Sequence, residues 1–250
     1  MKFLLVALNA KYIHSNPGLY SLCAYAGEKY RENIELAEYT INNEPGTILA
    51  DLYKRQPDVV GFSCYIWNYN MICDIVREFH KLMPKVPIWL GGPEVSFDAR
   101  DILERQKEVT GIMIGEGEAT FLQLLKHYLK EEGYEHFDKI PGIVTREGEY
   151  LPRELLNMDT LPFLYSNLGT FENRIIYYES SRGCPFRCSY CLSSVDKTVR
   201  VRDFSLVKKE LQFFLDNKVS QVKFVDRTFN CVHEHTMDIW RYILEHDNGI

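Results

Sequence analysis

The sequence predicts an α/β protein: a flavodoxin/Rossmann-like, doubly wound parallel sheet followed by the beginning of a second strand–helix alternation. Short apolar segments alternate with helical segments five times before residue 132. One apolar segment, residues 58–64, has no polar face, which is typical of a strand buried on both sides. A second alternation starts near residue 175. Repeated strand–helix units favour a parallel sheet with helices on both faces.

The first alternation supplies five predicted strands and five predicted helices. The predicted strands are residues 2–8, 34–39, 58–64, 87–90 and 111–114. The predicted helices are residues 17–30, 47–55, 69–83, 100–106 and 118–131. In the first helix, Leu19, Leu22 and Ala26 recur at helical spacing and form one apolar face. Pro84 ends the third helix.

The stretch from residue 133 to residue 173 interrupts the alternation. It contains Pro141, Pro152 and Pro162 and a turn at residues 146–149, so we predict a linker with a small hairpin. Beyond it we predict two strands and two helices, at residues 175–179, 205–217, 221–226 and 235–245. The predicted organisation is a first domain over residues 1–132, a linker over 133–173 and a second domain over 174–250.

The bulk composition is that of a globular protein. Of the 250 residues, 46% are hydrophobic and 26% are charged, which allows a sizeable core. The net charge of −6 argues against a general nucleic-acid-binding protein, which would normally present a basic patch. The apolar start at residues 3–8 is too short for a signal peptide, and no apolar run is long enough to cross a bilayer. We therefore expect a cytoplasmic protein whose thiols stay reduced.

Three of the seven cysteines lie in one short segment, with the spacing C-x3-C-x2-C at Cys184, Cys188 and Cys191. Three thiolates on one loop can ligate three irons of a [4Fe–4S] cluster, whereas electron-transfer clusters are ordinarily closed by four cysteines. The fourth iron would stay open to another ligand. A chance grouping is one alternative. A zinc site is another, but it needs a fourth ligand, and the nearby candidates form no second knuckle: Cys231, His233 and His235.

The cysteine spacing, the Gly183-Cys184-Pro185 start and the aromatic Tyr190 resemble the radical S-adenosylmethionine (SAM) enzymes. The resemblance implies that the three cysteines are the iron ligands, that SAM chelates the open iron, and that Tyr190 lies beside the adenine. It implies cleavage of SAM to a 5′-deoxyadenosyl radical, with the electron supplied by a reductant such as flavodoxin or ferredoxin. Residues 174–250 would then be the start of the (β/α) radical SAM barrel. Because a complete strand–helix barrel takes about 200 residues or more, we expect a truncated chain.

The segment after the second predicted barrel strand reads Phe-Val-Asp-Arg-Thr-Phe-Asn at residues 224–230. It is similar to the Phe-x-Asp-x-x-Phe form of the cobalamin-type radical SAM subgroup. The resemblance makes Asp226 the acceptor for the SAM ammonium group, through a charge-assisted hydrogen bond. The alternative is a helix N-cap. Arg182 and Arg187 flank the cysteines, where they either offset the charge of the cluster or are solvated loop residues.

Ligands of open parallel sheets bind at the carboxyl ends of the strands. Ser63 follows the third strand, Gly91-Gly92 the fourth and Gly115-Glu116 the fifth. This set resembles the cobalamin-binding domain that precedes the core of cobalamin-dependent (class B type) radical SAM enzymes. The resemblance implies that Ser63 and the two adjacent glycines line the pocket for the nucleotide tail of cobalamin. Alternatively, the glycines are ordinary strand-to-helix turns.

His14 follows the first strand in the segment Tyr-Ile-His-Ser-Asn-Pro-Gly, residues 12–18. The cobalamin domains of mutases and methionine synthase carry Asp-x-His-x-x-Gly here, and that histidine binds cobalt. In this chain the aspartate is absent and the glycine is displaced by one position, so the usual orienting partner is missing. Two interpretations remain for His14: a cobalt ligand, and a loop histidine hydrogen-bonded to the backbone.

These features favour a radical SAM enzyme that abstracts a hydrogen atom from an unactivated carbon and transfers a methyl group from cobalamin. The first alternative is a radical SAM cyclase, sulfur-inserting enzyme or oxidoreductase that does not use cobalamin. The second is a non-catalytic iron–sulfur or cobalamin-binding module. The 250-residue chain by itself can lack activity, and its sequence does not indicate a substrate.

Overall fold

The computed structural model describes residues 1–194, 197–246 and 249. The chain forms two compact units, Met1–Leu155 and Leu156–Ile250, called unit 1 and unit 2 below. The boundary between them falls within the stretch predicted as a linker.

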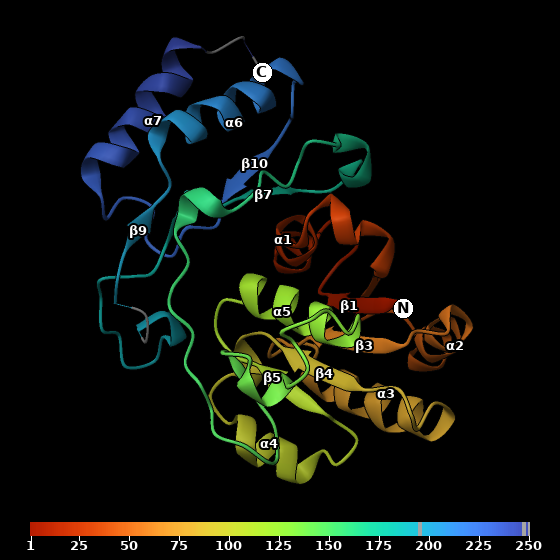
Figure 1. Ribbon diagram of the computed structural model, residues 1–250. Coiled ribbons are helices and arrows are strands. Elements are labelled where there is room, and N and C mark those ends of the chain that lie inside the picture. The colour runs from red at the N-terminus through yellow and green to blue at the C-terminus, as the bar shows by residue number, and fades with distance from the viewer. Residues whose placement is uncertain (195–196, 247–248, 250) are drawn as a thin grey trace. The chain divides into compact units, whose positions relative to one another are not determined.

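Unit 1 is built on a six-stranded sheet with the order β2-β1-β3-β4-β5-β6 (Figure 1). The strands are β1 (Phe3–Asn9), β2 (Ile34–Thr40), β3 (Val59–Ser63), β4 (Ile88–Gly91), β5 (Gly111–Met113) and β6 (Ile143–Val144). The first five are parallel, and β6 pairs antiparallel with β5. The chain runs from β1 outward to β2 and then returns to β3 on the other side of β1. The predicted doubly wound sheet is therefore confirmed, with its switch point between β1 and β3.

Helices cover both faces of this sheet (Figure 1). They are α1 (Pro17–Ala26), α2 (Pro45–Arg55), α3 (Tyr69–Leu82), α4 (Ala99–Arg105) and α5 (Glu118–Tyr128). Leu5 of β1 packs in one core with residues of α1 and α5, whereas its neighbours Leu4 and Val6 pack in the other with residues of α2, α3 and α4. Successive side chains of a strand point to opposite faces, and for this reason β1 is buried along its whole length.

Two predicted features of unit 1 are wrong. The first helix does not reach residue 30, because Gly27 adopts a φ of 82° and ends α1 at Ala26, after which residues 28–33 form a 3₁₀ helix. The predicted hairpin between residues 133 and 173 is reduced to a chain reversal without paired strands among the described residues, in which the Gly142 N–H donates to the Leu151 carbonyl at 2.8 Å. Its strand β6 instead pairs with β5 and closes one edge of the sheet.

Unit 2 contains β7 (Ile176–Tyr178), β8 (Ser181–Arg182), β9 (Arg200–Val201), α6 (Phe204–Asp216), β10 (Val222–Phe224) and α7 (His233–Glu245). The parallel pairing of β7 with β10 confirms the predicted second strand–helix alternation. A short antiparallel pair, β8 with β9, was not predicted. No closed barrel is present among the described residues of this unit.

A buried ion pair lies in the core of unit 2. The side chain of Arg202 donates to both carboxylate oxygens of Glu210, at 3.1 and 2.7 Å. The Tyr178 hydroxyl donates to the same carboxylate at 2.5 Å. Burial and the neighbouring Glu210 carboxylate raise the pKa of Tyr178, so its phenol stays protonated. These hydrogen bonds link β7 to α6, and they give each charged side chain that is buried in the core a partner.

Candidate functional site

The loop that joins β1 to α1 is held at the switch point by a hydrogen-bond network. Asn16 caps α1: its Oδ1 accepts from the N–H of Leu19 at 3.2 Å, while its Nδ2 donates to Ser63 Oγ at 3.1 Å. The backbone N–H of Asn16 and the Nδ2 of Asn9 both donate to Glu38 Oε1, at 3.0 and 2.9 Å. The ends of β1, β2 and β3 are thereby connected at one edge of the sheet.

Sequence reasoning missed Asn9, Asn16 and Glu38. A signal existed for Asn16, because an asparagine followed by proline is a strong start for a helix. No local signal exists for the contact between Asn9 and Glu38, since the two residues are 29 positions apart and meet through the register of β1 with β2.

The structure places His14 and Ser63 in this network. The His14 carbonyl accepts from Asn9 Nδ2 at 3.0 Å, and its N–H donates to the Lys11 carbonyl at 3.1 Å. The backbone of His14 is therefore fixed, whichever role its imidazole has. Ser15, the next residue, is 5% exposed, and its Oγ has no hydrogen-bond partner in the described part of the chain. A buried hydroxyl without a partner at the carboxyl edge of a parallel sheet is a group that a ligand can satisfy.

The glycine positions of the candidate site differ in whether a larger residue could replace the glycine. Gly92 has a φ of 107°, and a Cβ on it would lie 2.5 Å from the Cys64 carbonyl oxygen, so only glycine fits. Gly91 would bring its Cβ no closer than 3.6 Å to any neighbour. Gly115 has a φ of 75° and open space around it, and Glu116 beside it is half-buried. Glycine is required at residue 92 because the backbone turns there with a positive φ. The turn also brings residue 92 close to the backbone of Cys64, in the loop after β3.

The same edge carries exposed apolar side chains on the loops that follow β1, β3 and β4. They are Tyr12, Ile13, Ile66, Trp67 and Phe97. The rings of Tyr65 and Trp67 stack with their centroids 4.5 Å apart. Exposed apolar groups beside the polar network and the partnerless Ser15 hydroxyl suit a large ligand with an apolar face and polar substituents. On these observations the residues of unit 1 fit a corrin.

In unit 2 the three loop cysteines are free thiols. Cys184 is buried, Cys191 is half-buried and Cys188 is exposed, and the N–H of Cys191 donates to the Cys188 carbonyl at 3.1 Å. Among the described residues, no three Cys, His, Asp or Glu side chains gather closely enough to hold a metal ion. The donor set itself fits an iron–sulfur cluster, because three reduced sulfurs lie on one short loop.

Asp226 follows β10, and its carboxylate lies at the end of β7. It accepts from Ser180 Oγ at 2.8 Å, from Ser181 Oγ at 2.5 Å and from the Ser180 N–H at 3.3 Å. The N-cap of α7 is Val232, so the alternative of Asp226 as a helix cap is wrong. Because a carboxylate has about four acceptor positions, three hydrogen bonds leave capacity for a cation. The structure thus brings Asp226 beside the residues that lead into Cys184.

Other residues near the cysteines differ in how exposed their side chains are to solvent. Tyr190 is 91% exposed, which leaves its ring open to a ligand. Arg182 donates to Glu179 at 2.8 Å, whereas Arg187 is exposed. His235 on α7 is buried, its Nε2 has no hydrogen-bond partner in the described residues, and burial lowers its pKa. This imidazole is therefore neutral at physiological pH.

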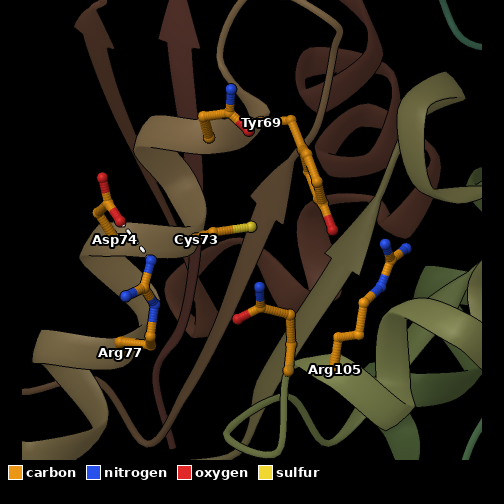
Figure 2. A pocket seen from close by; sticks show the side chains of 7 residues that line it. Tyr69, Cys73, Asp74, Arg77 and Arg105 are labelled. Carbon is orange, nitrogen blue, oxygen red and sulfur yellow. Dashed lines mark hydrogen bonds and ion pairs between the residues drawn. The ribbon is translucent and has the colours of Figure 1, made fainter.

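A cavity of about 300 Å³ lies elsewhere in unit 1, between α3 and the end of α4 (Figure 2). Tyr69, Cys73 and Arg105 line it, and Asp74 and Arg77 form an ion pair at its side. Burial raises the pKa of both Tyr69 and Cys73. Because a protonated thiol is a poor nucleophile, the cavity adds no reactive group to the candidate site.

None of the helices in the described residues has the length and apolar character that a membrane span requires.

Comparisons of sequence and fold identify proteins to which this chain is similar. The B12 binding domain family matches residues 4–125 of the chain. The cobalamin-dependent radical SAM methyltransferase TokK of Streptomyces tokunonensis is 26% identical over 196 residues, which are 70% of this chain and 28% of that protein. The hopanoid C-3 methylase of Methylococcus capsulatus is 33% identical over 158 residues, which are 57% of this chain and 29% of that protein.

A solved structure matches the fold of the whole chain. The cobalamin-dependent SAM radical enzyme OxsB, with aqua-cobalamin and SAM bound, superposes with a TM-score of 0.79 and 21% identity, covering 100% of this chain and 38% of that one. The chain therefore spans less than half the length of these proteins. In its match to the B12 binding domain family over residues 4–125 and in its similarity to TokK, the chain resembles the cobalamin-dependent radical SAM enzymes.

Proposed function

We propose that this chain carries the cofactor-binding part of a cobalamin-dependent radical SAM methyltransferase, in which unit 1 binds cobalamin and unit 2 binds a [4Fe–4S] cluster and SAM. One observation in unit 2 carries the proposal. The carboxylate of Asp226 is hydrogen-bonded to Ser180 and Ser181, directly before the segment that contains Cys184. A cation acceptor is thus fixed beside a loop with three free thiols.

Each residue has a defined role in this proposal. Cys184, Cys188 and Cys191 hold three irons, Asp226 accepts the SAM ammonium group, and the exposed ring of Tyr190 lies against the adenine. When bound, these cofactors supply hydrogen-atom abstraction and a methyl group. A one-electron reductant such as flavodoxin or ferredoxin serves the cluster.

In unit 1, Ser63, Gly91, Gly92, Gly115 and Glu116 line the cobalamin pocket. Ser63 is positioned by Asn16, and the turn at Gly92 allows close backbone approach. His14 offers its imidazole from a loop whose backbone is fixed by Asn9. The unpartnered hydroxyl of Ser15 is a further hydrogen-bonding group for the ligand.

The test is anaerobic reconstitution of the chain with iron and sulfide, followed by incubation with SAM and dithionite. We expect cluster absorbance, bound iron and formation of 5′-deoxyadenosine. Alanine at Cys184, Cys188 or Cys191 should each remove most of the iron, whereas Cys231→Ala, a cysteine outside the loop, should retain it. Full iron retention in any one of the three loop variants would contradict the assignment. Absorbance of bound hydroxocobalamin distinguishes this function from radical chemistry that does not use cobalamin.

A further inference from the structure

A hydroxyl from a different part of the chain contacts the first of the three cysteines. Thr228 Oγ1 lies 3.2 Å from Cys184 Sγ, although the two residues are 44 positions apart in the sequence. Cys184 is only 9% exposed, so water competes little for its sulfur. The distance is that of a hydrogen bond to sulfur.

The position of Thr228 is fixed from both sides. Two residues earlier, Asp226 is held by hydrogen bonds to Ser180 and Ser181. One residue later, the Phe229 carbonyl accepts from Thr236 Oγ1 at 2.7 Å, which ties the segment to α7. The segment therefore lies along residues 180–184 in a defined register, and the contact with Cys184 follows from that register.

The direction of this hydrogen bond is set by the state of the sulfur. A cysteine that ligates iron is a thiolate, which has no proton to donate, so the threonine hydroxyl must be the donor. Hydrogen bonds to cluster sulfurs withdraw negative charge and are among the factors that set the reduction potential of iron–sulfur clusters. A donor at this sulfur stabilises the more electron-rich, reduced state.

We propose that Thr228 is a positioning residue that donates a hydrogen bond to the Cys184 thiolate and raises the reduction potential of the [4Fe–4S] cluster. This inference rests on the proposed function, because it requires Cys184 to be an iron ligand. It assigns Thr228 an effect on the ease with which an external one-electron donor reduces the cluster.

The experiment compares Thr228→Val, which keeps the shape and removes the hydroxyl, with Thr228→Ser, which keeps the hydroxyl. Thr160→Val is the matched control, because Thr160 is exposed and its hydroxyl donates to the Asn157 carbonyl. Iron content and the midpoint potential are measured on reconstituted protein by redox titration, followed by electron paramagnetic resonance. Thr228→Val should shift the potential to a more negative value, Thr228→Ser should restore it, and Thr160→Val should leave it unchanged.

The outcomes separate this inference from the proposed function. A loaded Thr228→Val chain with the wild-type potential would overturn the inference and leave the cluster assignment intact. If Thr228→Val assembles no cluster but Thr228→Ser does, the hydroxyl is required for cluster assembly rather than for the potential, and the inference as stated fails. If neither assembles a cluster while the wild type does, the shape of the side chain matters and the inference fails. A wild-type chain that assembles no cluster would overturn the proposed function, and the inference with it.

Discussion

Asp226, the residue proposed to bind the SAM ammonium group, has a carboxylate that the protein itself holds in place. Ser180 and Ser181, which position its carboxylate, are almost fully buried. Burial of both donors keeps these hydrogen bonds from exchanging with water, so the carboxylate is fixed before any ligand arrives. Binding a cation there costs little reorganisation, which favours affinity.

Asp226→Asn should weaken SAM binding without removing the cluster. Asparagine keeps the size of the side chain and can still accept from the two serine hydroxyls, but it carries no charge for the ammonium group. Loss of one charge-assisted hydrogen bond should cost about 1.5–3 kcal/mol, or roughly tenfold to a hundredfold in affinity. The measurement is a SAM titration of cluster-loaded protein. Asp238→Asn, a carboxylate on α7 that pairs with Arg241, is the control. Unchanged SAM affinity with an intact cluster would refute the role of Asp226.

Residue types with a sequence motif were predictable, whereas residues that act through remote contacts were not. The cysteines and Asp226 belong to short motifs whose chemistry is visible in the sequence. Glu38 has ordinary neighbours, and Thr228 lies in the segment that contains Asp226, but the contacts of both residues depend on partners that the fold brings to them. No local pattern encodes such a pairing, because it depends on the register of strands that are distant in the sequence.

Among the elements, the turn after β4 carries two residues of the proposed cobalamin site, Gly91 and Gly92, and has a specific backbone requirement. Its first residue, Gly91, still pairs in the sheet, because its carbonyl accepts from the Cys64 N–H at 2.7 Å. Its second residue, Gly92, has φ and ψ of 107° and 172°, a region that is open essentially to glycine alone. The two adjacent glycines therefore have different physical requirements, although they look alike in the sequence.

Gly92→Ala should destabilise unit 1 far more than Gly91→Ala. The backbone conformation at residue 92 costs a non-glycine residue about 1–3 kcal/mol, and the added Cβ would also collide with the backbone of Cys64. Gly91→Ala should change the stability by less than about 1 kcal/mol, because its Cβ meets only ordinary contacts. Urea unfolding can be followed by the fluorescence of buried Trp89 on β4. Equal unfolding free energies for the two variants would contradict this account of the turn.

The periodic spacing of apolar residues predicted the positions of most helices and strands. It failed for elements that are too short to show a repeating pattern. The strands β1 to β5 lie where the apolar segments predict them. The strand β6 has two residues and β8 has two, so neither shows an alternation that could be recognised. The end of α1 was missed because the apolar spacing continues past Gly27, although the backbone there leaves the helix.

The buried ion pair should be decisive for the stability of α6. Arg202 and Glu210 have side-chain exposures of 7% and 8%, so Arg202→Met would leave a buried carboxylate without its partner. Breaking one member of a buried pair typically costs about 3–5 kcal/mol. Hydrogen exchange should report a loss of that size in the opening free energy of α6, with α3 in unit 1 as the internal reference. Arg241→Met, which breaks an exposed pair, should cost less than about 1 kcal/mol. Equal effects of the two variants would contradict the expected large cost of leaving the Glu210 carboxylate buried without its partner.

At the scale of the whole molecule, each unit has its own core and its own candidate site. Unit 1 has apolar cores on both faces of its sheet. Unit 2 has a cluster of aromatic rings, in which Tyr165 lies 4.8 Å from Phe171 and 5.6 Å from Phe214, between ring centroids. A sequence with two strand–helix alternations predicts two such cores, and the physical reason is that each sheet must cover its own apolar faces.

The two cofactors should therefore bind independently in the 250-residue chain. Replacing all three loop cysteines by alanine should abolish iron binding and leave hydroxocobalamin affinity unchanged, because the residues proposed for cobalamin all lie in unit 1. Conversely, Ser63→Ala should weaken hydroxocobalamin by roughly twofold to tenfold, the value of about one hydrogen bond, with iron content unaffected. Combining the changes should give the sum of the separate effects, since sites without shared partners are normally additive. Iron analysis and a corrinoid absorbance titration on the same samples measure both quantities. Loss of corrinoid affinity in the cysteine variant would contradict independent binding of the two cofactors.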